Sequence, residues 1–208
     1  MKNLIFDIEA DGLTPSKIWC IVAKDLDSNT VYEYGPDKLE EGIELLRNAE
    51  TLVGHNIIGY DIPVIEKLHR VKLTSNVIDT LVLSRLFQPV RENGHSLRTW
   101  GYRIGVHKQV QPDDFDCYTP EMLSYCRQDV LLNEQVYLKL LEEGRGFNQE
   151  SIDLETNVAK IMHEQEQTGF LFDIEKASML LAKLKTRMVE VEDEVQRTFT
   201  VSYTHLRA

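Results

Sequence analysis

The 208-residue sequence contains little cysteine, no long apolar run and comparatively few basic residues. Its three cysteines, Cys20, Cys117 and Cys126, are odd in number and form no Cys-x-x-Cys pattern, which argues against a disulfide framework and against a zinc cluster. The N-terminal apolar stretch 4–6 is interrupted by Asp7, so neither a membrane span nor a secretory signal is predicted. We therefore expect reduced thiols in a cytoplasmic chain that has no membrane partner.

Basic residues are outnumbered by acidic ones, 23 against 34, which gives a formal net charge of −11. This acidity at first argues against a nucleic-acid partner, because phosphate binding depends mainly on lysine and arginine. However, residues 51–108 contain 8 basic and only 4 acidic side chains. These basic side chains could follow a phosphate backbone or could be an ordinary solvated surface. They are Lys67, Arg70, Lys72, Arg85, Arg91, Arg98, Arg103 and Lys108.

Strand and helix patterns alternate along the first 144 residues, which predicts an α/β domain. Strands are expected at residues 4–9, 18–26, 30–34, 51–54 and 77–79. Helices are expected at residues 39–46, 61–69, 81–87 and 120–144. The last of these starts with Pro120 at its first position and Thr119 as its cap.

The pattern changes after Gly146 to two helices, at about 149–167 and 173–198, which we expect to form a helical hairpin. Apolar side chains repeat along the second helix at heptad spacing and need a partner to cover them. They are Ala177, Leu181, Leu184, Met188, Val191 and Val195. The expected organisation is a domain of residues 1–146, a helical segment of residues 147–200 and a non-native or disordered tail of residues 201–208.

An acidic pair, Asp7 and Glu9, falls within the first predicted strand. Residues i and i+2 of a strand face the same way, so both carboxylates project from one face. Two like charges at this distance are costly unless a cation neutralises them, and carboxylate oxygens suit Mg²⁺ or Mn²⁺. The alternative is a solvated edge strand that carries two surface acids.

Two further patterns carry acids. Asp61 stands at a predicted helix start, where it could be a simple N-cap or could lie at the ligand site that an open α/β sheet forms beyond its strand ends. Tyr125 and Asp129 are four residues apart and share one face of a predicted helix. A buried tyrosine above a helical acid is also common enough for this pair to be a core residue and a surface residue by chance.

Together and in this order, three motifs resemble those of the DEDDy 3′→5′ exonucleases: Asp7-Ile8-Glu9, Asn56-x-x-x-Tyr60-Asp61 and Tyr125-x-x-x-Asp129. Within that superfamily the chain is most similar to the proofreading domain of bacteriophage-type family A DNA polymerases. The stretches 79–86 and 95–105 support the likeness, and stretch 169–173 resembles the segment that leads into the polymerase domain. The resemblance implies an RNase H-like mixed sheet flanked by helices, followed by the helical hairpin.

The resemblance also implies a site that holds two divalent metal ions, Mg²⁺ or Mn²⁺. Asp7 would bridge both ions, Glu9 and Asp129 would complete the first position, and Asp61 would support the second. Tyr125 would orient the attacking water. Two metal ions about 3.5–4 Å apart suit phosphodiester hydrolysis because they stabilise both the attacking and the leaving oxygen.

Asn56 and Tyr60 would lie beside the terminal nucleotide, as a hydrogen-bonding amide and a stacking ring. The implied activity removes 5′-mononucleotides from single-stranded or frayed DNA 3′ ends during proofreading, in the host cytoplasm if the protein is phage-encoded. The missing polymerase domain of the same parent chain would be its partner, and these 208 residues are not expected to polymerise. Two alternatives are a free-standing exonuclease of this fold acting on RNA or DNA ends, and a catalytically silent nucleic-acid-binding module.

Overall fold

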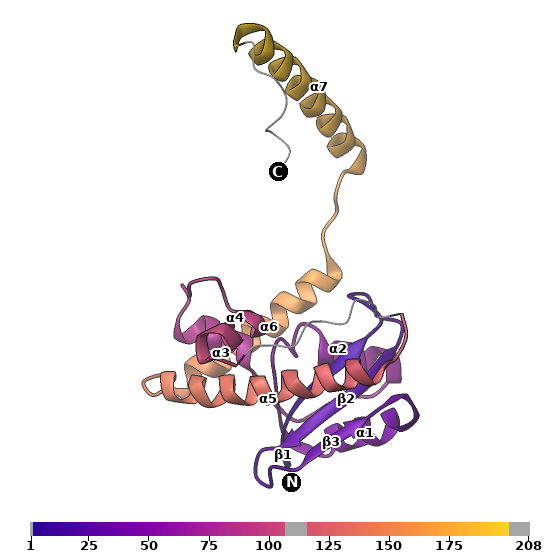
Figure 1. The fold of residues 1–208 in the computed structure, drawn as a ribbon, viewed down its shortest axis with the longest axis vertical. Helices are drawn as coiled ribbons and strands as arrows, with labels where there is room; N and C mark the ends of the chain where they lie inside the picture. Colours follow the sequence, from indigo (N-terminus) through magenta and orange to yellow (C-terminus); the bar gives the residue numbers. More distant parts are fainter. Residues whose placement is uncertain (1, 107–115, 200–208) are drawn as a thin grey trace. The chain divides into compact units, whose positions relative to one another are not determined.

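The computed structural model describes residues 2–106 and 116–199, and its centre is a mixed five-stranded sheet (Figure 1). The strand order is β3-β2-β1-β4-β5. The strands are β1 (Lys2–Ala10), β2 (Ile18–Asp25), β3 (Val31–Tyr34), β4 (Ala49–Gly54) and β5 (Asn76–Asp79). Strand β2 is antiparallel to β1 and β3, whereas β4 is parallel to β1 and to β5. The predicted α/β class and the five predicted strands are confirmed.

Helices flank this sheet, and two more follow in the C-terminal part of the chain. They are the short 3-10 helix η1 (Pro36–Lys38) and α1 (Leu39–Arg47), α2 (Asp61–His69), α3 (Thr80–Phe87), α4 (Leu97–Ile104), α5 (Pro120–Glu143), α6 (Gln149–Thr168) and α7 (Ile174–Phe199). The sequence patterns did not predict α4. Its ends carry ordinary signals, because the Ser96 Oγ accepts from the Thr99 N–H and Gly105 takes a left-handed φ of 73°. Gly101 inside these eight residues weakens the helical pattern.

The side chains of β1 alternate between two cores. Phe6 and Ile8 lie in the core that also contains buried residues of α1 and α2. Ile5 lies in the core on the other face, with Met122 and Val130 of α5. Helix α5 packs against both β1 and β2 on this second face (Figure 1). By strand periodicity, residues 7 and 9 share the face of Ile5 and therefore project toward α5.

A third core lies among α3, α4 and the second half of α5, around Trp100. The Arg91 guanidinium lies 4.4 Å from the Trp100 ring centroid and pairs with Glu143, and Arg103 lies 5.2 Å from the same ring. Lys72 pairs with Glu66. Three of the eight basic residues of segment 51–108 therefore have partners within the fold. For the other basic residues the phosphate-binding interpretation stays a prediction, and Lys108 lies outside the described residues.

The chain divides into two compact units, residues 1–167 and residues 168–208. Almost all of α6 belongs to the first unit, where Ile152 packs against the third core and the Phe147 ring lies 4.8 Å from the Phe87 ring. The two C-terminal helices are confirmed, but their packing as a hairpin and the predicted boundary after Gly146 stay predictions. The predicted tail, residues 201–208, lies outside the described residues.

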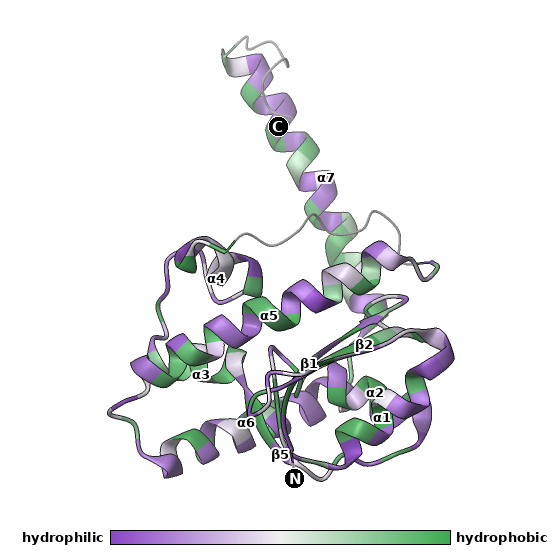
Figure 2. Cartoon of the chain, turned by 60° about the horizontal axis from the view of Figure 1, so that its bottom comes forward, coloured by the Kyte–Doolittle hydropathy of each residue, from purple (hydrophilic) through white to green (hydrophobic). Residues whose placement is uncertain are grey.

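Helix α7 carries its heptad side chains on an exposed surface. Leu181, Leu184, Met188, Val191 and Val195 are 40–61% exposed. Apolar and polar segments alternate along the helix in Figure 2. Across residues 2–106 and 116–199, no helix is long and apolar enough to cross a membrane.

Candidate active site

The two carboxylates of β1 lie beside a sulfur atom of α5. One carboxylate oxygen each of Asp7 and Glu9 and the Cys126 Sγ all lie within 4.8 Å of one another. Glu9 is only 9% exposed although it is acidic. The pairing of β1 with β2 shifts register between Glu9 and Ala10, and such bulges often re-aim side chains near active sites. The predicted projection of both acids from one face is therefore consistent with this arrangement.

Asp61 lies next to this pair. One of its carboxylate oxygens accepts a hydrogen bond from the Ile8 N–H at 3.2 Å, and Ile8 stands between Asp7 and Glu9 in the chain. The interpretation of Asp61 as a simple N-cap is wrong, since the cap position of α2 is Tyr60 and no side chain makes a cap hydrogen bond there. The carboxylate instead reaches back to β1, 53 residues earlier. Asp61 is 3% exposed, and this burial raises the pKa of its carboxyl group to about 7.

This raised pKa makes the stability of the metal-free chain depend on pH. The pKa of the Asp61 carboxyl is 3.8 in the unfolded chain and about 7 in the folded chain, so the folded chain holds this proton more tightly. The free energy of unfolding therefore falls as pH rises between these two values. In EDTA, Asp61→Asn should raise the melting temperature relative to the parent, by more at pH 7 than at pH 4. A divalent cation should stabilise the parent more than the variant. A melting-temperature difference that is the same at every pH would contradict this assignment.

Helix α5 supplies Tyr125 and Asp129, which are 6% and 5% exposed. The helix begins as predicted, with Pro120 at its start and the Thr119 Oγ accepting from the Met122 N–H at 3.2 Å. The Cys126 thiol donates to the backbone oxygen of Asp7 at 3.4 Å, which fixes this turn of α5 against β1. Asp129 lies about one helical turn beyond Cys126, and its Oδ1 is buried. Because Asp129 is buried, the alternative in which it is an ordinary surface acid is wrong.

Cys126 lies at this site, but the sequence motifs did not predict a role for it although it directly follows Tyr125. Burial, the neighbouring Cys20 thiol and the Asp7 carboxylate raise the pKa of the Cys126 thiol well above its usual range. A protonated sulfur is a poor ligand for a hard cation such as Mg²⁺. All three cysteines are free. Cys126 therefore packs α5 against the acidic strand.

Asn56 and Tyr60 belong to the loop between β4 and α2. Asn56 takes a left-handed φ of 65°, which asparagine tolerates better than most residues. The Tyr60 hydroxyl donates to the Gly12 carbonyl oxygen at 2.6 Å. Burial, followed by the charges of Asp61, Glu9 and other acids, raises the pKa of Tyr60 to about 12. Tyr60 therefore stays protonated beside the acids, and its contact with a nucleotide remains a prediction.

Asp79 holds this loop in place, a role that the sequence patterns did not reveal. Its carboxylate accepts from the Asn56 N–H at 2.8 Å and from the Ile58 N–H at 3.0 Å. It also caps α3 by accepting from the Leu81 N–H at 2.9 Å. The available signal was an acid that ends an apolar strand and precedes a helix. Asp79 thus links the end of β5 to the loop that delivers Asp61.

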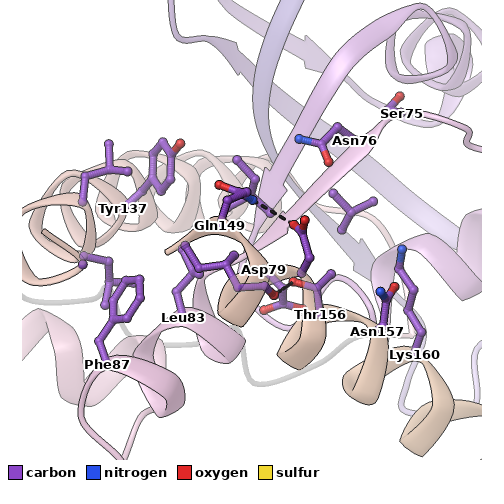
Figure 3. Close-up of a pocket in the computed structure, with 17 residues that line it drawn as sticks. Ser75, Asn76, Asp79, Leu83, Phe87, Tyr137, Gln149, Thr156, Asn157 and Lys160 are labelled. Carbon is purple, nitrogen blue, oxygen red and sulfur yellow. Dashed lines mark hydrogen bonds between the residues drawn. The ribbon is translucent and has the colours of Figure 1, made fainter. Parts of the chain in front are cut away.

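A cavity of about 470 Å³ lies elsewhere, along the outer edge of β5 (Figure 3). Its walls come from β5, α3, the end of α5 and α6, and in Figure 3 Thr156, Asn157 and Lys160 of α6 form one side. None of the four predicted metal ligands lines it. Asp79, which does, already accepts three backbone hydrogen bonds. This cavity is therefore not the acidic site.

The donor set at the end of β1 fits divalent cations. Carboxylate oxygens come from β1, from the start of α2 and from α5, and hard cations such as Mg²⁺ and Mn²⁺ prefer such ligands. A bound cation would also offset the cost of ionising the buried Asp61. The ligand roles of Asp7, Glu9, Asp61 and Asp129 remain predictions of the resemblance.

Comparisons with known proteins agree with this fold. Residues 4–103 match the RNase H superfamily. Brucella melitensis NrnC bound to pGG superposes with a TM-score of 0.62 at 18% identity, covering 84% of this chain and 89% of NrnC. Escherichia coli RNase D, an exoribonuclease, superposes with a TM-score of 0.59 at 16% identity, covering 78% of this chain and 45% of RNase D. The chain therefore has the RNase H-like fold that NrnC and RNase D share, and its residues 4–103 are similar to the RNase H superfamily.

More particular relatives are the DNA-directed DNA polymerases of Escherichia phage T7 and Enterobacteria phage T3. Each is 27% identical over 260 aligned positions, which cover 94% of this chain. The chain spans 37% of the length of each polymerase.

Proposed function

We propose that the chain is a divalent-metal-dependent 3′→5′ exonuclease that removes 5′-mononucleotides from single-stranded or frayed DNA ends. The observation that carries this proposal is that β1, the start of α2 that bonds to it and the helix α5 that packs against it supply four buried or half-buried acids. Asp7 and Glu9 come from the strand, Asp61 bonds to the strand between them, and Asp129 comes from the helix packed beside it. Such acids are costly unless the site holds cations.

The proposed ligand set is Asp7, Glu9, Asp61 and Asp129. Two bound divalent cations would supply charge neutralisation and would stabilise the attacking and leaving oxygens of the phosphodiester. Tyr125, one residue before the Cys126 contact with β1, would orient the attacking water through its hydroxyl group. The fixed position of α5 against β1 serves this function, because positioning is effective only when the supporting groups are held in place.

The substrate end is proposed to be single-stranded, because paired bases must separate before their terminal phosphodiester can reach acids at the end of a sheet. A mismatched end frays more readily, so coupling to a polymerase would favour removal of errors. The match of 94% of the chain to the two phage polymerases supports a proofreading role within a larger parent protein.

A free-standing exonuclease acting on short RNA or DNA is the second candidate. The observation in its favour is the fold likeness to NrnC bound to pGG and to RNase D. A silent nucleic-acid-binding module is the third candidate, and the presence of all four acids and the tyrosine argues against it.

Polarity separates the proposed activity from other nucleases. With Mg²⁺, a 5′-labelled single-stranded DNA should shorten progressively from its 3′ end and release 5′-mononucleotides, faster than the matched duplex does. A duplex that ends in a mismatch should be digested at an intermediate rate. Gel electrophoresis and chromatography of the products measure both properties.

An RNA strand of the same sequence is the control for substrate class. Preference for DNA supports proofreading, and preference for RNA supports the free-standing alternative. Release of the 5′ label as the first mononucleotide would overturn the proposed polarity.

A further inference from the structure

A small groove lies beside Tyr60, between α2 and α6. It is formed by residues 13–15, 59–60, 63–64, 67–68, 163 and 167, and we call it the α2–α6 groove. All of these residues belong to the first compact unit. Tyr60 connects the groove to the site, because it directly precedes Asp61 in the chain and its hydroxyl donates to the carbonyl oxygen of Gly12, three residues after Glu9.

The charge of the groove differs from that of the chain as a whole. Among the described residues that line it, none is acidic, whereas Lys67 and His163 offer nitrogen groups from two different helices. Lys67 is exposed at the surface of α2, and Lys72, which lies outside the groove, is already paired with Glu66. A chain with a net charge of −11 thus presents a non-acidic groove directly beside its acids.

The size of the groove limits what it can hold. At about 130 Å³ it is smaller than a pocket of roughly 300–1,000 Å³ that encloses a whole small-molecule ligand. It suits one phosphate and sugar of a strand that continues past it. The rigid ring of Pro15, the Leu13 side chain and Tyr60 supply apolar walls on which a sugar could pack.

From this geometry we propose that the α2–α6 groove binds the phosphodiester backbone of the single strand that leads into the acidic site, with Lys67 and His163 contacting phosphate. This inference rests on the proposed nuclease function. It gives α6 a role in substrate binding although all of the proposed metal ligands precede residue 130. The groove holds a strand upstream of the end being cut, so its contribution grows with the length of the strand.

Binding without cleavage tests the proposal. The full chain is titrated into a fluorescein-labelled ten-nucleotide oligothymidylate in EDTA, and anisotropy is followed at several salt concentrations. Each phosphate that a basic side chain neutralises adds about 0.7 to the magnitude of the slope of log Kobs against log salt. Lys67→Ala and His163→Ala should each weaken binding, and Lys67→Ala should reduce the slope by about this amount.

Lys72→Ala is the matched control, because Lys72 lies outside the groove and pairs with Glu66. It should leave affinity and slope unchanged. The Lys67 effect should be smaller for a dinucleotide than for the ten-nucleotide strand. Unchanged affinity and slope in both groove variants would overturn the proposal.

The parent chain is assayed separately with Mg²⁺ on the p-nitrophenyl ester of thymidine 5′-monophosphate, which has no upstream nucleotide. Absence of hydrolysis there would count against the proposed function, whereas loss of the length-dependent Lys67 effect would count against the groove.

Discussion

Asp7→Asn is expected to abolish metal-dependent digestion of single-stranded DNA, with a loss of about 10³-fold or more in rate. Asp7 is held against the other groups of the site, since its carboxylate is within 4.8 Å of both Glu9 and Cys126 and its backbone oxygen accepts from the Cys126 thiol. Asparagine keeps the shape of the side chain but removes the charge that would hold the cations. Initial rates with saturating Mg²⁺ measure the effect.

The fold should survive this substitution. Removing one of two neighbouring like charges relieves repulsion in the metal-free chain, so the melting temperature in EDTA should stay equal or rise. Asp37→Asn is the matched control, because Asp37 is an acid in η1, far along the chain from the motifs, and it should retain parental activity. Parental rates in a folded Asp7→Asn variant, or undiminished digestion in EDTA, would remove Asp7 from the proposed machinery.

Tyr125→Phe is expected to lower the rate by roughly 10²-fold or less, as befits the loss of one positioned hydrogen bond. The ring is 6% exposed on α5, so phenylalanine preserves its packing and removes only the hydroxyl group. Asp129→Ala, one turn later, should cost more because it removes a proposed metal ligand. Single-turnover rates measured across a pH range give the comparison.

Tyr137→Phe is the control for this helix. Tyr137 lies on α5 but lines the cavity beside β5, away from the acids, and its variant should behave like the parent. If Tyr125→Phe matched the parent at every pH, the positioning role would have to be abandoned.

Local patterns in the sequence predict most of the elements. Alternation along residues 4–9 indicated β1 and the shared face of its two acids, and the Thr119-Pro120 signal marked the start of α5. Helix α4 was not predicted because it has only eight residues and Gly101 weakens its helical pattern. Its stability comes from burying Trp100. Short helices held by tertiary packing leave little periodic signal.

Long-range contacts explain what the sequence could not predict at the site. An acid before a helical stretch is typical of an N-cap, and only the folded chain shows the Asp61 carboxylate bonded to the Ile8 N–H. Lys24 pairs with Glu134 at 2.6 Å across 110 residues, joining β2 to α5. Arg91 and Arg103 were grouped by charge in the sequence, yet both stack on Trp100.

Manganese binding to the metal-free chain, followed by electron paramagnetic resonance of the free ion, tests the metal centre without any substrate. The acids around β1 predict that the parent binds two Mn²⁺ ions with saturation and that Asp7→Asn loses binding at both positions, because Asp7 is proposed to bridge them. A parent chain that binds no Mn²⁺, or an Asp7→Asn chain that binds as much Mn²⁺ as the parent, would contradict a two-metal nuclease centre.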